Sequence, residues 1–218
     1  ACTQRQERLK LMSYNIRNGI GIDNIQDIGR IARVILREAP DLVALQELDS
    51  ATLRVDGRYI PGELGRMTGM HATFGRAIGF AGGSYGIGRP EPLAVRSIPL
   101  PGREEARVLL MAEFPDYTVC ITHLSLTPED RLASLPIIRE ATDTCRKPVL
   151  LAGDFNTGNA AAVLAGLGGG FRILSDTTRM TFPSDNPAVR IDYILGRGLP
   201  TSATVAESAV DHTATASD

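Results

Sequence analysis

The stretch PVLLAGDFNTG, Pro148 to Gly158, joins the most apolar run of this 218-residue chain to a sudden series of polar side chains. A short continuous apolar run such as Val149–Ala152 is typical of a buried strand. Asp154 and Asn156 follow this run directly. Because α/β proteins place their sites in loops at the carboxyl ends of strands, the stretch predicts an apolar strand followed by a candidate site.

Extended and helical patterns alternate on both sides of this stretch, as they do in α/β domains. A strand, a helix and a second strand within the first fifty residues suggest a crossover unit. Residues 106–114 and 117–124 are separated by a turn too short for a crossover, which predicts an antiparallel hairpin. The strands are expected at residues 9–16, 41–48, 71–76, 106–114, 117–124, 148–155, 171–175 and 190–195.

The expected helices have recognisable first turns. Asp23 or Asn24 is expected to cap the first helix, with Gln26 three residues after Asp23 as in a capping box, and Pro40 to stop it. Further helices are expected near 62–68 and 159–167, whereas the glycine-rich residues 79–88 suggest a flexible loop. A helix capped by Thr127 is expected to point these residues inward: Leu132, Leu135, Ile138 and Ala141.

The charge balance bears on the partners. Lys and Arg number 23 against 25 Asp and Glu, so the net charge of −2 provides no general attraction to a nucleic-acid backbone. The chain also has no Trp and no basic tract, which disfavours nucleic acid as a partner without excluding it. We expect a phosphoester substrate that is a small molecule or lipid-derived, and a monomeric protein.

The cysteines and the chain start say little about compartment. Cys2, Cys120 and Cys145 form neither a paired framework nor a C-x-x-C motif, and no apolar run is long enough for a transmembrane segment. Ala1-Cys2 could be the remnant of a lipoprotein processing site or of cloning. The compartment stays open, with a periplasmic, secreted or Cys2-anchored location slightly favoured over the cytoplasm.

Polar residues end several of the expected strands. Taken singly, Asn15 could close a local turn, Glu47 could be a solvated acid and His123 a hydrogen-bonded core residue. Together they suggest a site at the carboxyl ends of the strands. Asp192 lies within the apolar segment RIDYIL, where an unpaired charge would be costly, so it should have a cationic, metal or hydrogen-bonding partner.

The whole pattern resembles the endonuclease/exonuclease/phosphatase superfamily, and most closely its compact bacterial members. The resemblance implies a DNase I-like fold: a four-layer α/β sandwich in which helices flank two face-to-face mixed β-sheets. It covers nearly the whole chain, so one domain over residues 1–218 is expected. The motifs that carry it, in the family's order, are SYNIRNG (13–19), LQELD (45–49), THLSL (122–126), LAGDFNTG (151–158) and RIDYIL (190–195).

The resemblance also implies a divalent-metal-dependent hydrolase of phosphate esters. Glu47 looks like the principal ligand of Mg²⁺ (or Mn²⁺), with Asn15 beside it as a ligand or direct neighbour. Asp154 looks like the residue that orients or deprotonates the attacking water. Mg²⁺ typically takes only one or two carboxylates and keeps several waters, which suits this set. The mechanism we expect is direct attack of water on phosphorus, without a covalent enzyme intermediate.

The remaining roles implied by the resemblance concern the phosphate group and the substrate. Asn156 looks like a hydrogen-bonding group on the phosphoryl oxygens, His123 like a phosphate contact and Asp192 like a further site residue. Tyr85, in the glycine-rich segment, and Arg107 match positions that face the substrate in relatives.

The end of the chain departs from the family pattern. Relatives end with Ser-Asp-His and a strand that closes the second sheet, and Ser217-Asp218 fits the start of that segment. We therefore expect Asp218 to be catalytic and the chain to continue with His and a last strand. In the alternative, Asp211-His212 is the dyad. Between Gly88 and Arg89, a strand common in the family is either deleted or missing from the numbering.

Three functions follow from this sequence. A phosphodiesterase or phosphatase acting on a small or lipid-derived ester is favoured over an endonuclease or exonuclease because of the charge balance. The third alternative is a binding module that retains the fold without the chemistry. Such a module would be expected to have lost Glu47, Asp154 or Asn156, and all three are present.

Overall fold

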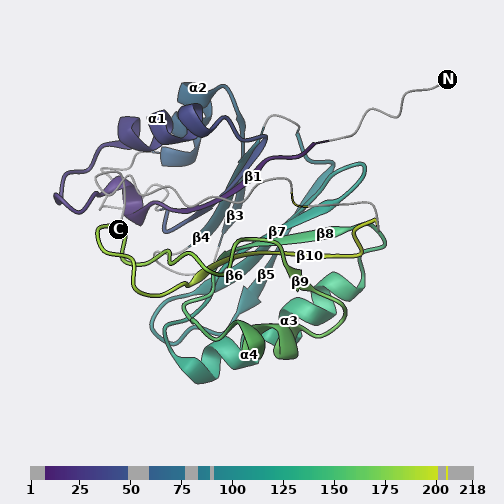
Figure 1. Ribbon diagram of the computed structural model, residues 1–218. Coiled ribbons are helices and arrows are strands. Elements are labelled where there is room, and N and C mark those ends of the chain that lie inside the picture. Colours follow the sequence, from purple (N-terminus) through teal and green to yellow (C-terminus); the bar gives the residue numbers. More distant parts are fainter. Residues whose placement is uncertain (1–7, 49–58, 77–82, 89–90, 201–204, 206–218) are drawn as a thin grey trace.

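Two β-sheets pack face to face between two pairs of helices in this computed structural model (Figure 1). The structure describes residues 8–48, 59–76, 83–88, 91–200 and 205. In this part of the chain, no helix is long and apolar enough to cross a membrane. Cys120 is buried and Cys145 half-buried, while Cys2 lies outside the described residues.

The first sheet has the strand order β1-β2-β4-β3. β1 and β2 are parallel and are joined through α1, which confirms the predicted crossover unit. α1 and α2 cover the outer face of this sheet (Figure 1). The elements are β1 (Leu11–Asn15), η1 (Arg17–Gly19), α1 (Ile28–Glu38), β2 (Leu42–Gln46), α2 (Ile60–Thr68), β3 (His71–Arg76) and β4 (Gly83–Gly88).

The second sheet has the order β5-β6-β7-β8-β10-β9 and is covered by α3 and α4 (Figure 1). β6 and β7 pair antiparallel, which confirms the predicted hairpin, and β7 and β8 pair parallel through α3. The elements are β5 (Ala94–Leu100), β6 (Arg107–Glu113), β7 (Thr118–His123), α3 (Pro128–Asp143), β8 (Val149–Asp154), α4 (Ala160–Leu167), β9 (Arg172–Ile173) and β10 (Asp192–Arg197).

Alternating side chains divide the interior into three apolar cores. In β2, Val43 and Leu45 pack with α1 and α2, whereas Leu42 and Ala44 point to the opposite sheet. The same alternation in β8 directs Leu151 to the helices of the second sheet. Because successive side chains of a strand face opposite ways, three cores separate four layers, and the predicted four-layer α/β sandwich is confirmed.

The first helix begins later than the sequence suggested. Asp27 is the cap of α1, and its side chain accepts a hydrogen bond from the Arg30 amide. Asp23 instead closes a local turn by accepting from the Ile25 amide, and Gln26 donates to the Asn18 carbonyl. The predicted capping box at Asp23 is therefore wrong, because these side chains hold the loop that precedes the helix.

The glycine-rich segment also differs from its prediction in its described part, since residues 79–82 lie outside the described residues. Its last six residues, Gly83–Gly88, form β4, which pairs on both sides with β2 and β3. Two flanking ladders of hydrogen bonds outweigh the weak strand preference of glycine. At Gly86 a Cβ would lie 3.0 Å from Ile121 Cδ1 of the facing sheet. The glycine therefore allows the two sheets to pack closely here, and it does not mark a flexible loop.

Two smaller differences concern exposed positions. Leu132 of α3 is 59% exposed, although it was expected to face inward with Leu135 and Ile138, which are buried. Strand β5 had no prediction, because it lies at the sheet edge, is largely exposed and contains Pro99. Thr127 does precede α3 as predicted, but its side chain makes no capping hydrogen bond.

β7 and β8 leave no room for a side chain at Gly153, where β8 reaches the candidate site. A Cβ at Gly153 would lie 1.9 Å from the carbonyl oxygen of Thr122, and Gly153 has a φ of +155°. Neither backbone can move away without breaking the parallel pairing. The glycine of the GDFN motif is therefore required by the sheet itself, one residue before Asp154.

We predict that Gly153→Ala lowers the free energy of unfolding by more than about 2 kcal/mol, because the new methyl group meets backbone rather than a side chain. Urea unfolding followed by circular dichroism measures this. Gly170→Ala is the control, since Gly170 also has a positive φ but has nothing within 4 Å, and it should cost about 1 kcal/mol. Equal losses in the two variants would contradict the clash.

Candidate active site

The candidate site lies where the carboxyl ends of β1 and β2 meet β7 and β8 of the facing sheet. Asn15 is the last residue of β1, and Glu47 directly follows β2. Asn15 Nδ2 donates to Glu47 Oε1 at 2.8 Å and lies 3.3 Å from Asp154 Oδ2. One amide thus links carboxylates that belong to different sheets.

The second sheet contributes a row of three residues through its register. His123 of β7 pairs with Asp154 of β8, which in turn pairs with Asp192 of β10. Residues in register on neighbouring strands lie side by side. This explains why three motifs that are far apart in the chain meet at one edge of the sheet.

Asp154 is oriented through one oxygen and faces the site with the other. Its Oδ1 accepts from the Asn156 amide at 2.8 Å, and its Oδ2 faces Asn15. Burial is the main cause that raises the pKa of Asp154, and the negative charge of Asp192 raises it further. The hydrogen bonds from Asn156 and Asn15 act in the opposite direction.

His123 is a neutral imidazole beside two carboxylates. Its Nε2 lies 3.8 Å from Asp154 Oδ2 and 4.0 Å from Glu47 Oε1. Burial and the positive charge of Arg107 lower the pKa of His123 to about 3, although Glu104 acts in the opposite direction. At neutral pH these contacts are therefore polar neighbours rather than salt bridges.

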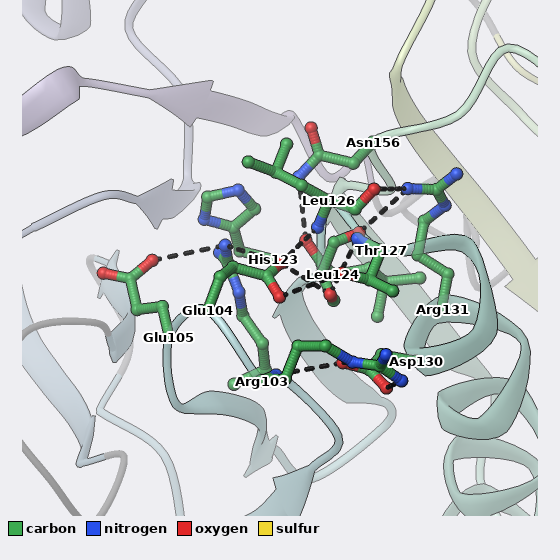
Figure 2. A network of polar contacts seen from close by, with 12 residues as sticks. Arg103, Glu104, Glu105, His123, Leu124, Leu126, Thr127, Asp130, Arg131 and Asn156 are labelled. Carbon is green, nitrogen blue, oxygen red and sulfur yellow. Dashed lines mark hydrogen bonds and ion pairs between the residues drawn. The ribbon is translucent and has the colours of Figure 1, made fainter.

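Asn156 is held in place by the loop that follows β7. Its Nδ2 donates to the Leu124 carbonyl at 2.8 Å, and Figure 2 shows the amide turned toward that loop. Asn156 and Glu47 both have positive φ, near +50°, which is uncommon outside glycine. Such backbone conformations concentrate at functional sites, and Arg17 and Asn18 beside them share this feature.

The other predicted site residues are not shown to contact this group. Arg107 is buried, and its Nη2 lies 3.2 Å from Glu105 Oε2, so its expected contact with substrate stays a prediction. Tyr85 belongs to β4, where its backbone pairs with Leu45 and Phe74. The expected catalytic residue Asp218, the alternative dyad Asp211-His212 and the junction at residues 89–90 lie outside the described residues.

The sequence did not predict the polar network that holds the loop after β7. It is built on Glu104, whose carboxylate accepts from Ser125 and from the Leu126 amide. The segment REEAR, residues 103–107, reads as an ordinary solvated charge run, and no local pattern shows that one of its acids turns inward. Only the pairing of β5, β6 and β7 brings these segments together.

The donor set fits a hard divalent cation. Glu47 and Asp154 bring two carboxylates to the same amide nitrogen, and Asp192 adds a third negative charge that acts on Asp154. In the described part of the chain, no three His, Cys, Asp or Glu side chains form a ready cluster. Mg²⁺ needs only one or two carboxylates and keeps its waters, so a site for it does not require a cluster of three such side chains.

The amide of Asn15 points in a way that narrows its role. Its Oδ1 accepts from the Arg17 amide at 3.1 Å, while its Nδ2 faces the carboxylates. Of the two roles expected for Asn15, this orientation corresponds to the direct neighbour that holds Glu47. Glu47 is then the residue that would provide a carboxylate to a cation.

Comparisons with solved structures find the same fold at low sequence identity. An endonuclease/exonuclease/phosphatase structure from Beutenbergia cavernae has 23% identity and a TM-score of 0.66, over 87% of this chain and 64% of that chain. A mannosyl-6-phosphatase from Bacteroides thetaiotaomicron has 17% identity and a TM-score of 0.69, over 88% and 86%. The human nocturnin catalytic domain with a bound sulfate anion has 18% identity and a TM-score of 0.65, over 87% of this chain and 83% of that chain.

The chain thus spans 64% of the Beutenbergia protein's own length. A search of curated proteins found no match. The sequence itself matches the Endonuclease/Exonuclease/phosphatase family over residues 12–218, which includes every motif around Asn15, Glu47, His123, Asp154 and Asp192. By this match the chain belongs to the Endonuclease/Exonuclease/phosphatase family, whose members are hydrolases of phosphate esters.

Proposed function

We propose that the protein is a divalent-metal-dependent hydrolase of phosphate esters, acting by direct attack of water on phosphorus. The observation that carries the proposal is the convergence of Glu47, Asp154 and His123 around Asn15, where the ends of both sheets meet. A site for a phosphate ester has to offset negative charge and accept a proton from water. Glu47 could hold the cation that offsets this charge, and Asp154 could accept the proton.

Glu47 would hold Mg²⁺ or Mn²⁺, with Asn15 fixing the carboxylate through its amide hydrogen. When bound, the cation would offset negative charge on the phosphoryl oxygens. The side chain of Glu47 is 33% exposed, so one face of it remains accessible to water and substrate. Its carboxylate accepts from Asn15 of the neighbouring strand and lies 4.0 Å from His123 Nε2 of the facing sheet.

Asp154 would accept the proton of the attacking water. Its Oδ1 is engaged by the Asn156 amide, which leaves Oδ2 directed into the site. As the bond between the water oxygen and phosphorus forms and the bond to the leaving oxygen breaks, the proton passes to Oδ2. The raised pKa of Asp154 makes its carboxylate a better proton acceptor than an exposed one.

Asn156 and His123 would bind the phosphoryl oxygens. An amide NH₂ group carries two hydrogens, so one can remain on the Leu124 carbonyl while the other donates to the substrate. A neutral imidazole can donate from one ring nitrogen without adding a charge that would compete with the cation. Asp192, in register with Asp154, adds negative charge beside that residue.

For the substrate, a small or lipid-derived ester is favoured. The net charge of −2 offers no broad attraction to a nucleic acid, whose binding normally depends on clustered cations. One structural neighbour is a mannosyl-6-phosphatase, so a monoester belongs in the test beside a diester. A nuclease remains the second candidate, because nucleases are part of the family's description.

The test is hydrolysis of p-nitrophenyl phosphate and bis-p-nitrophenyl phosphate with Mg²⁺ or Mn²⁺. Turnover should disappear with chelator, and Glu47→Ala and Asp154→Ala should each lower kcat/KM by at least about 100-fold. Glu113→Ala is the control, because Glu113 pairs with Lys147 at the opposite end of β6.

The preferred ester would separate a phosphatase from a phosphodiesterase. Cleavage of single-stranded or duplex DNA at rates above those for both small esters would favour the nuclease instead. Turnover that persists in chelator, or that survives Glu47→Ala, would contradict the proposed metal-dependent mechanism.

A second prediction tests the cation site without turnover. Asn15→Asp places a third carboxylate beside Glu47 and Asp154, so in chelator its Tm should fall below that of the neutral Asn15→Ala. Excess Mg²⁺ or Mn²⁺ should raise the Tm of Asn15→Asp more than that of Asn15→Ala, because ligand binding stabilises the folded state. Equal responses of the two variants would argue against a cation at this point.

A further inference from the structure

Glu104 makes an unusual set of contacts in the loop between β5 and β6. Its Oε1 accepts from Ser125 Oγ and from the Leu126 amide, each at 2.5 Å, and its Oε2 accepts from Thr127 Oγ1 at 3.3 Å (Figure 2). Thr127 therefore directs its hydroxyl to Glu104 instead of capping α3. A single carboxylate thus binds three successive residues of the loop that follows β7.

This loop is also in direct contact with the candidate site. Leu124 donates its amide to the Asp154 carbonyl at 2.9 Å and accepts from Asn156 Nδ2 at 2.8 Å. His123 is the residue immediately before it. A movement of the loop would therefore change the positions of His123 and Asn156 together, while Glu47 on the other sheet would stay in place.

Glu104 is charged in this position. Burial raises the pKa of its carboxyl, but the hydrogen bonds from Ser125 and Leu126 and the charge of Arg107 outweigh burial and lower it to about 2. Arg107 Nη2 lies 3.8 Å from Glu104 Oε1 and is itself buried. Hydrogen bonds to an ionised acceptor are shorter and stronger than neutral ones, which suits an anchor.

The loop around Glu104 is itself fastened to α3. Arg103 binds Asp130 through two side-chain hydrogen bonds, from Nη2 to Oδ1 at 2.8 Å and from Nε to Oδ2 at 3.1 Å. On the other side, Arg131 Nη1 donates to the carbonyls of Ser125 and Leu126 (Figure 2). Both segments that Glu104 joins are thus also hydrogen-bonded to side chains of α3.

We propose that Glu104 is a positioning residue of the active site, which holds the Leu124–Thr127 loop so that His123 and Asn156 face the phosphate. The inference rests on the proposed function for its catalytic consequence. Its structural part, the dependence of the Asn156 amide on Glu104, stands independently of any turnover.

The first test compares Glu104→Ala, Glu104→Gln and the control Glu113→Ala, using the ester that the wild-type protein hydrolyses best. Glu104→Ala should lower kcat by about 10- to 100-fold with little change in KM, because misplaced groups affect the transition state most. Glu104→Gln should recover part of kcat, since its amide oxygen can accept from Ser125 and its NH₂ can donate to Thr127. Glu113→Ala should match the wild type.

An unchanged kcat in Glu104→Ala, or an equal fall in Glu113→Ala, would overturn the proposal. Loss of folded protein is tested separately by thermal unfolding. If Glu104→Ala fails to fold, the comparison rests on Glu104→Gln, and a kcat equal to the wild type in that folded variant together with unshifted Asn156 resonances would overturn the proposal.

The second test needs no activity. In ¹H–¹⁵N spectra, the side-chain NH₂ of Asn156, assigned by its loss in Asn156→Asp, and the Leu126 amide should both shift in Glu104→Ala and stay in place in Glu113→Ala. If the wild-type protein hydrolyses neither ester, the proposed function fails while this measurement still applies. Asn156 resonances that do not respond to Glu104→Ala would overturn the positioning role.

Discussion

The close pairing of β7 with β8, which the absence of a side chain at Gly153 permits, determines where the candidate site can form. It sets His123 beside Asp154, and the antiparallel pairing on the other side of β8 sets Asp192 beside the same residue. The backbone register alone therefore places these polar residues side by side, independently of their side-chain contacts. A shift by one residue would turn every member of the row to the opposite face.

The packing of the two sheets brings two further polar residues to this row. Asn15 and Glu47 come from parallel strands of the first sheet, and Asn15 spans the space between Glu47 and Asp154. Burial raises the pKa of Asp154, and the nearby negative charges of Asp192 and Glu47 raise it further. A divalent cation would offset these negative charges, and for this reason we propose that the same residues hold Mg²⁺ and activate water.

Much of this arrangement could be predicted from the sequence because its signals are local. Apolar runs that end in Asn15, Glu47 and Asp154 predict strands and the edge at which they finish. Features that depend on residues far away in the sequence could not be predicted. The glycines of β4 suggest a loop until β2 and β3 are placed beside them, and Glu104 resembles a solvated acid until β5, β6 and β7 are paired. Asp27, rather than Asp23, caps α1 because Asp23 is occupied in a turn of its own.

We propose that Glu47, held by Asn15, provides the carboxylate that would bind a divalent cation. Electron paramagnetic resonance during a titration with Mn²⁺ tests it most directly, because free and bound ions differ in signal. Saturable binding should appear in the wild-type protein and in Glu113→Gln, and should be lost or strongly weakened in Glu47→Gln, which removes the charge and keeps the shape of the side chain. Equal Mn²⁺ binding in the wild type and Glu47→Gln would rule out Glu47 as the cation ligand.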